Sequence, residues 1–174
     1  MLRLYPHRIR GEGHFLACLR RAGDAPPADL LRPAAERLSP PAPAMRAAYE
    51  AFAGHLCGLP PANAQLGDAL LFAPDLPPLD GVRVLRAGVQ LGSMKGKVFA
   101  PDHALAMVLS PACGLPSLAL NREEALRYQS GEALPAPEGM SGWALTVYEG
   151  LVLGFGKASG GQFKNHYPKG LRRP

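Results

Sequence analysis

Apolar residues in the middle of the chain recur first at helical spacing and then at strand spacing. Tyr49, Phe52 and Leu56 lie three and four positions apart, which is one face of an amphipathic helix over residues 45–57. We expect that helix to end at Gly58, just before a proline. Shorter apolar, β-branched or alternating runs predict strands, at residues 69–73, 82–91 and 97–100.

Two further helices are predicted from the residues at their ends. A proline followed by Asp102 opens an apolar segment, which predicts a helix over residues 101–109 with the carboxylate near its positive end. Asn121 and Glu124 have the three-residue spacing of a capping box, in which each side chain bonds the other residue's backbone N–H. That helix should close at Gly131.

Both ends of the chain carry the pattern of a β-hairpin. Residues 143–148 and 151–155 read as two strands joined by the two-residue turn Glu149-Gly150. At the other end, RLYPHR and HFLACLRR read as short strands around a polar turn at residues 9–13. A hairpin of that size is marginal alone in water, so we expect it to pair with further structure.

Residues 26–43 contain six prolines, which remove backbone donors and predict a linker. The elements on either side predict an α+β fold. We divide it into a terminal hairpin (1–24), a Pro-rich linker (25–44), a small α/β domain (45–114) and a mainly-β domain (115–174). The last unit spans only about 60 residues, which is small for an independent core, so it should dock on the preceding domain.

Positive charge is concentrated at the end of the chain. The formal net charge of the 174 residues is +5, and residues 150–174 carry five Lys or Arg with no Asp or Glu. These cations alternate with a histidine, a tyrosine and a leucine, as in a segment folded against a domain. Clustered cations beside aromatic rings are typical of surfaces that bind a phosphate backbone with accessible bases.

Ten residues are candidate RNA contacts. In the last segment they are Lys157, Lys164, Asn165, His166, Tyr167, Lys169, Arg172 and Arg173, and earlier in the chain they are Lys95 and Lys97, which flank a predicted turn. The cations should meet phosphates, and Tyr167 or His166 should pack on a base or sugar. Asn165 has an alternative role, because asparagine also bonds its own backbone in a turn.

Other kinds of site are disfavoured. The histidines, at positions 7, 14, 55, 103 and 166, have no metal-ligand spacing, and Cys18, Cys57 and Cys113 form no paired motif. Glycines at 88, 92 and 96 follow a predicted strand but match neither a P-loop nor a dinucleotide fingerprint. We therefore expect no metal, no cofactor and no catalytic residue in this chain. Cysteine usage and the lack of a long apolar run favour a cytoplasmic protein with no membrane partner.

Three segments together resemble a known family. RLYPHRIRGEGHFLACLRR resembles the end of the catalytic domain of the NOL1/NOP2/Sun family of RNA cytosine-5 methyltransferases. LRAGVQLGSMKGKVFAPDHALAMVL resembles the first C-terminal domain of its RsmF-type bacterial members, and GWALTVYEGLVLGFGKASGGQFKNHYPKGLR resembles their terminal PUA-like RNA-binding domain. The resemblance covers most of the chain outside the linker.

The resemblance implies a parent enzyme that methylates small-subunit ribosomal RNA at carbon 5 of cytosine, with S-adenosylmethionine as donor. The family's cofactor loop and catalytic cysteine motifs match no position here, and Cys113 stands in a different context. We therefore expect a non-catalytic part that captures ribosomal RNA for the catalytic domain, with no DNA partner. The alternative is a protein-docking module, whose edge strands and exposed apolar residues bind the catalytic domain or the ribosome. The feature that would distinguish it is the N-terminal hairpin, Leu2 to Arg21, which lacks the rest of its sheet.

Overall fold

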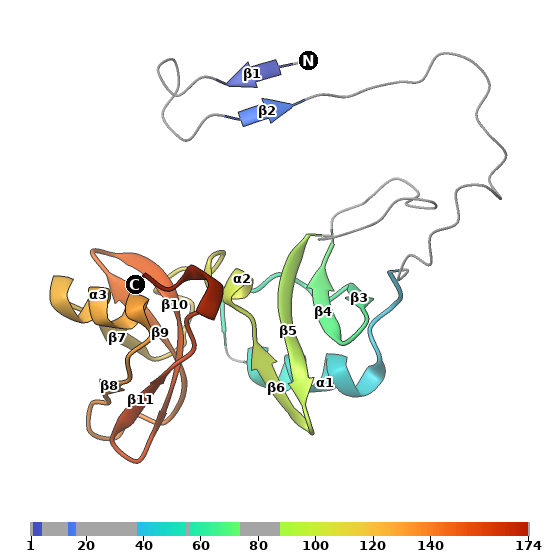
Figure 1. Cartoon of the computed structure of the whole chain (residues 1–174). Helices are drawn as coiled ribbons and strands as arrows, with labels where there is room; N and C mark the ends of the chain where they lie inside the picture. The colour runs from blue at the N-terminus through green and yellow to red at the C-terminus, as the bar shows by residue number, and fades with distance from the viewer. Residues whose placement is uncertain (1, 5–13, 17–37, 55, 74–87, 174) are drawn as a thin grey trace, which may run out of the picture.

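Helices and sheets are mixed in the computed structural model, which describes residues 2–4, 14–16, 38–54, 56–73 and 88–173 (Figure 1). Within these ranges three sheets are formed, and the fold is α+β as predicted. Strands β1 (Leu2–Leu4) and β2 (His14–Leu16) pair antiparallel, which confirms the N-terminal hairpin. The rest of that hairpin prediction, and the Pro-rich segment 26–37, lie outside the described residues.

A four-stranded antiparallel meander forms the first large sheet. Its strands follow chain order: β3 (Ala64–Leu66), β4 (Ala69–Phe72), β5 (Val89–Lys95) and β6 (Val98–Pro101). Gly96 has φ +63° in the turn between β5 and β6, a conformation that glycine adopts at no steric cost. The strand predicted at 82–91 overlaps only the start of β5, and its first part lies outside the described residues.

The second large sheet has five strands in the order β7-β9-β10-β11-β8. Their bounds are β7 (Ser117–Ala119), β8 (Leu134–Pro135), β9 (Gly142–Tyr148), β10 (Leu151–Ser159) and β11 (Gln162–Asn165). The Glu149-Gly150 turn joins β9 to β10 with both φ values positive, at +49° and +79°, as the hairpin prediction required. Strand β7 adds on the other side of β9 in parallel.

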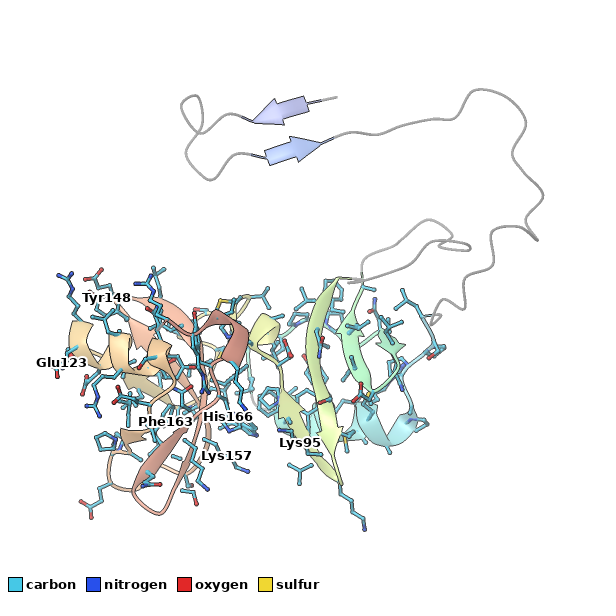
Figure 2. All side chains as sticks on the ribbon, viewed as in Figure 1. Lys95, Glu123, Tyr148, Lys157, Phe163 and His166 are labelled. Atoms are coloured by element: carbon cyan, nitrogen blue, oxygen red, sulfur yellow. The ribbon has the colours of Figure 1, made fainter. Side chains whose placement is uncertain are left out.

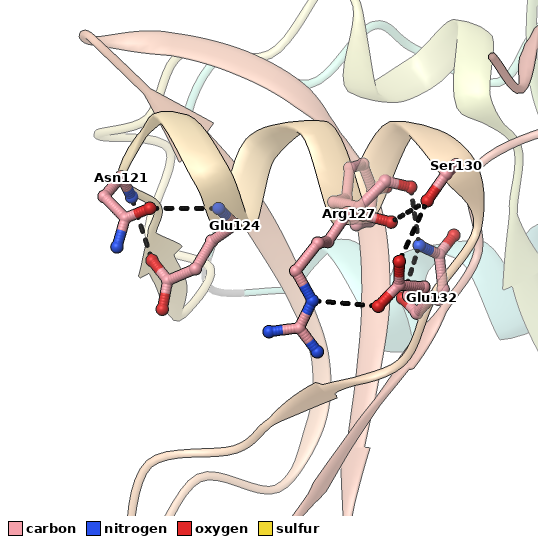
Figure 3. A network of polar contacts seen from close by, with 7 residues as sticks. Asn121, Glu124, Arg127, Ser130 and Glu132 are labelled. Carbon is pink, nitrogen blue, oxygen red and sulfur yellow. Dashed lines mark hydrogen bonds and ion pairs between the residues drawn. The ribbon is translucent and has the colours of Figure 1, made fainter. Parts of the chain in front are cut away.

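Helix α3 (Arg122–Ser130) begins with the predicted capping box (Figure 3). The Asn121 side chain accepts a hydrogen bond from the backbone N–H of Glu124, and the Glu124 carboxylate accepts one from the backbone N–H of Asn121, both at 2.9 Å. Gly131 ends the helix at φ +97°. These bonds occupy N–H groups that the first turn of a helix leaves without partners.

Replacing Asn121 with alanine should lower the free energy of unfolding by about 1 kcal/mol, because the cap bond is lost. Glycine at the same position should cost only a few tenths of a kcal/mol, since it suits the capping conformation. Urea unfolding followed by far-UV circular dichroism measures both. Equal losses for the two variants would contradict a role for the cap.

Helices α1 (Pro43–Ala53) and α2 (His103–Ala106) are shorter than predicted. The first ends at Gly54 rather than Gly58, and the prediction of a longer helix was wrong. For α2, Pro101 is the last residue of β6 instead of a helical residue, and Asp102 is the cap, accepting a hydrogen bond from the Ala104 N–H at 2.9 Å. At this proline, pairing with β5 determines the structure, although the local sequence favours a helix.

One hydrophobic core joins the two large sheets. Met45 and Tyr49 of α1, Leu91 of the first sheet, and Leu145 and Phe155 of the second sheet belong to one buried cluster. Phe155 is only 2% exposed. We expected the last unit to dock on the preceding domain because of its small size, and buried apolar contacts make this docking. As a result, neighbouring surfaces of the two sheets lie beside one another (Figure 1).

Candidate nucleic-acid interface

Three side chains form a row across the middle of the second sheet. Lys157 of β10 is the register partner of Trp143 on β9 and of Lys164 on β11. Residues directly opposite one another in antiparallel strands project from the same face. The two lysines are exposed and the tryptophan is half-buried, so the row presents two cations beside an aromatic ring.

The neighbouring row on this face is buried. Leu145 and Phe155 are register partners, lie on the same face as Trp143 and Lys157, and both belong to the core between the sheets. The face therefore changes, within two residues of each strand, from an apolar docking surface to an exposed basic one. This puts the basic row at the edge of the junction between the two sheets.

His166 completes the row from the segment after β11. Its backbone N–H donates to the Phe155 carbonyl at 3.2 Å, and its ring centroid lies 4.5 Å from that of Trp143 in an edge-to-face arrangement. The Lys157 ammonium lies 5.7 Å from the Trp143 ring centroid, within cation–π range. The lysine, the indole and the imidazole are thus held together by short contacts.

Charge also links this group to the first sheet. The pKa of His166 is lowered by burial and, after that, by the positive charges of Lys95, Lys157 and Lys164. Lys95 is the last residue of β5, so both sheets contribute to one electrostatic site. Figure 2 shows Lys157 and His166 on the side of the second sheet that faces Lys95. We call Lys95, Lys157, Lys164 and His166, with Trp143, the basic cluster.

Three other predicted cations lie on the surface. Lys97 is exposed in the β5–β6 turn, and Lys169 is exposed in the short 3-10 helix η2 (Lys169–Leu171). Arg173 is exposed, and its backbone N–H donates to the Gln129 carbonyl at 3.2 Å. These positions are open to solvent, as phosphate contact requires, and their role stays a prediction.

Asn165 serves the fold through its amide. Its Nδ2 donates to the carbonyls of Tyr128 and Glu132, at 2.7 and 2.9 Å, and its Oδ1 accepts from the Tyr167 N–H at 2.7 Å. The structural alternative considered from sequence is therefore the role observed. By tying β11 to the end of α3, these bonds fix the path of the chain that carries His166.

Tyr167 points into protein rather than along the basic surface. Its half-buried ring makes edge contacts with His103 of α2 and Tyr128 of α3, at centroid distances of 5.3 and 5.4 Å. The Tyr128 hydroxyl in turn donates to the Phe155 carbonyl at 2.8 Å. Of the two aromatic residues suggested for base contact, His166 has the suitable position.

Arg172 packs over the end of α3 instead of facing outward as predicted. Its guanidinium occupies the space beside Gly131, where a Cβ atom would come within 2.6 Å of three of its atoms. Its Nη2 lies 3.4 Å from the Tyr167 carbonyl, a long hydrogen bond. A cation at a helix C-terminus is favoured by the helix dipole, which gives this half-buried arginine a structural reason for its position.

His103 makes the stability of the junction depend on pH. Burial lowers its pKa from the ordinary value of 6.5, and the nearby Asp102 opposes that shift. As pH falls below about 6.5, the unfolded chain takes up a proton that the folded chain resists, so the free energy of unfolding should decrease. Between about pH 7.5 and 5.5 the decrease should be smaller for His103→Gln, as measured by urea unfolding.

His166 has a lowered pKa too and contributes a decrease of the same sign. The Glu132 carboxyl, whose pKa is lowered by its hydrogen bond from Arg127, loses its contribution only below its ordinary value of about 4.5. Plots of the free energy of unfolding against pH for the wild type and His103→Gln therefore differ through His103 alone in this pH range. Parallel curves would show that the His103 ring keeps its ordinary pKa.

Trp143 is the member of the cluster that sequence reasoning missed. It was assigned to a strand, but its place beside Lys157 depends on the register between β9 and β10. Lys164 joins them only because β11 pairs with β10, and β11 was not predicted. The sequence did contain one indication of this site. Phe155 and Lys157 lie two positions apart on β10 and so share a face, and the change from phenylalanine to lysine marks where that face passes from buried to exposed.

Two domain families match nearly all of the chain from residue 40 onward. Residues 40–109 match the RsmF rRNA methyltransferase first C-terminal domain, and residues 115–173 match the Methyltransferase RsmF PUA domain. The chain carries the two C-terminal domains of the RsmF family. The basic cluster is therefore shared between an RsmF first C-terminal domain, which supplies Lys95, and an RsmF PUA domain, which supplies the other members.

Curated relatives agree with the RsmF assignment. A protein of Erwinia tasmaniensis named "Ribosomal RNA small subunit methyltransferase F" is 27% identical over 99% of this chain and 38% of its own length. Proteins of the same name from Aliivibrio fischeri and Shewanella loihica are 27% identical over 99% of the chain and 34% identical over 59% of it. The chain spans 38% of the Erwinia and Aliivibrio relatives and 21% of the Shewanella relative.

Among the described residues, no helix has the length and apolarity that a membrane crossing needs. The buried Cys113 and the exposed Cys57 are both free thiols in the structure, and the Cys57 backbone N–H donates to the Cys113 carbonyl at 2.7 Å. Cys113 is 1% exposed and packs in the core between the sheets. Its environment is that of a small buried hydrophobic residue.

Proposed function

We propose that this chain is the RNA-binding, non-catalytic part of an S-adenosylmethionine-dependent methyltransferase that forms 5-methylcytosine in small-subunit ribosomal RNA. The observation that supports this most strongly is the basic cluster, in which the charges of Lys95, Lys157 and Lys164 act on one imidazole at the junction of two RsmF-family domains. Its role is to hold ribosomal RNA in register for the catalytic domain. That domain binds S-adenosylmethionine, and this chain holds no cofactor.

Electrostatics explains how such a surface binds RNA. The charged groups that shift the pKa of His166 are three lysines, and no carboxylate is among them. These lysines create a local excess of positive charge. Phosphates that pair with them release counterions, which supplies affinity that does not depend on base sequence. These contacts fix the position and orientation of the RNA, and base identity is read elsewhere.

The division of labour is part of the proposal. Cys113 is 1% exposed in the core, where it is closed to substrate. We assign the nucleophile and the cofactor site to the catalytic domain, and we propose that domain as the protein partner of this chain. We place the protein in the cytoplasm, bound to RNA and to neither DNA nor a membrane.

Binding of the whole chain to a labelled decoding-region fragment of small-subunit ribosomal RNA tests this function. Fluorescence anisotropy over a salt series should show affinity falling with salt. The slope of log affinity against log salt should be about −2 if the three lysines each contact one phosphate of a single strand. It should reach about −3.5 if Lys169 and Arg173 also take part. A slope near zero, or no binding at low salt, would reject an RNA-binding role.

A further inference from the structure

The position of Trp143 carries an inference that rests on the proposed RNA-binding function and goes beyond phosphate contact. Its indole is half-buried rather than sealed, although the core that it borders offers full burial to its neighbours Leu145 and Phe155. Three different side chains contact it: Phe155, Lys157 and His166. An aromatic surface that is partly open and lies among cations is chemically suited to contact with a nucleic-acid base.

We propose that Trp143, together with His166, is a stacking platform for an unpaired base, so that the basic cluster takes single-stranded RNA. Every base has a π-face, and stacking on an aromatic side chain requires that the base be free of a duplex. The row Trp143–Lys157–Lys164 sets the geometry, because the aromatic ring and the two cations follow one another across adjacent strands. A base on the ring places its flanking phosphates toward the lysines.

Lys157 has two positions in this scheme. In the free protein its ammonium lies against the indole at 5.7 Å from the ring centroid. A cation held there covers apolar surface while staying hydrated, as long charged side chains do. On binding, the ammonium moves to a phosphate and a base takes its place over the ring.

His166 supports the platform without adding a fixed charge to it. Its ring stands edge-to-face on Trp143, at an angle of 64° between the ring planes, and its backbone is tied to the Phe155 carbonyl. Burial, and after it the positive charges of Lys95, Lys157 and Lys164, disfavour a proton on this imidazole. The neutral ring then lies beside the indole without adding a charge to the surface on which a base stacks.

Intrinsic fluorescence gives a direct test, because Trp143 is the only tryptophan in the chain. The chain is titrated with three probes of about ten nucleotides per strand: oligoadenylate, an abasic ribose-phosphate oligomer of the same charge, and an RNA duplex, which carries twice that charge. Anisotropy of labelled probes reports binding, and tryptophan emission reports stacking. We expect oligoadenylate alone to quench the emission, and Trp143→Ala to weaken its binding roughly 5- to 150-fold. Trp143→Phe should recover part of that loss.

The outcomes separate the two proposals. Binding of all three probes with unchanged tryptophan emission would overturn the stacking platform and leave the RNA-binding function standing. Equal quenching by the abasic oligomer would also overturn it, because the signal would then come from movement of Lys157 rather than from a base. Failure of every probe to bind at low salt would reject both. Because the titrations use the wild-type chain, they decide the matter even if Trp143→Ala fails to fold.

Discussion

Replacing Lys157 and Lys164 together with alanine should weaken the binding of single-stranded RNA about 25-fold at about 0.1 M salt. The two residues are register partners on β10 and β11, are both exposed, and lower the pKa of the same imidazole. Each phosphate contact on a single strand contributes about −0.7 to the salt slope, so the slope should become less steep by about 1.4. Fluorescence anisotropy over a salt series measures the affinity and the slope together.

The matched control removes the same charge elsewhere. Arg46 on α1 and Arg122 at the start of α3 are exposed arginines outside the basic cluster, and Arg46→Ala with Arg122→Ala lowers the net charge by the same amount. If the cluster is the binding surface, this pair should leave affinity within a few-fold of wild type. Equal losses for the two pairs would mean that only net charge matters, and the cluster would lose its special role.

Replacing Phe155 with alanine should lower the free energy of unfolding by about 3–5 kcal/mol. The side chain is 2% exposed and lies in the core shared by the two sheets, where its removal leaves a cavity as well as lost apolar contact. Because that core holds the two RsmF domains together, a single change in the PUA domain should destabilise both. Urea unfolding followed by far-UV circular dichroism measures the change.

Leu151→Ala is the control within the same strand. Leu151 is 69% exposed at the start of β10, and its truncation should change the free energy of unfolding by no more than about 0.5 kcal/mol. A two-step unfolding curve for Phe155→Ala, with one step unshifted from wild type, would contradict the shared core. It would show instead that the two domains unfold independently.

Elements whose signals are local could be predicted from sequence. The capping box of α3 needs only Asn121 and Glu124, and the β9–β10 turn needs only Glu149 and Gly150, so both were found. Proline at position 101 misled the prediction, because proline is tolerated on an edge strand such as β6 as well as in the first turn of a helix. Local preference alone does not decide between the two.

The candidate site depends on contacts between distant segments, and there the sequence was less informative. Asn165 and Arg172 are polar residues in a basic tail, but their partners on α3 lie more than thirty residues away along the chain, as the Asn165 to Tyr128 hydrogen bond shows. Lys95 is separated from Lys157 by two helices and four strands along the chain. Only the packing of the two sheets brings these lysines to one imidazole. Composition identified the cations without showing which of them act together.

Protection of lysines from acetylation by bound ribosomal RNA tests the central claim most directly. The chain has five lysines, Lys95, Lys97, Lys157, Lys164 and Lys169, so mass spectrometry can follow each one with and without RNA. We expect RNA to slow acetylation most at Lys95, Lys157 and Lys164, and to slow these three together as RNA concentration rises. Unchanged reactivity at these three residues while RNA is bound would contradict a shared RNA surface at the junction of the two domains.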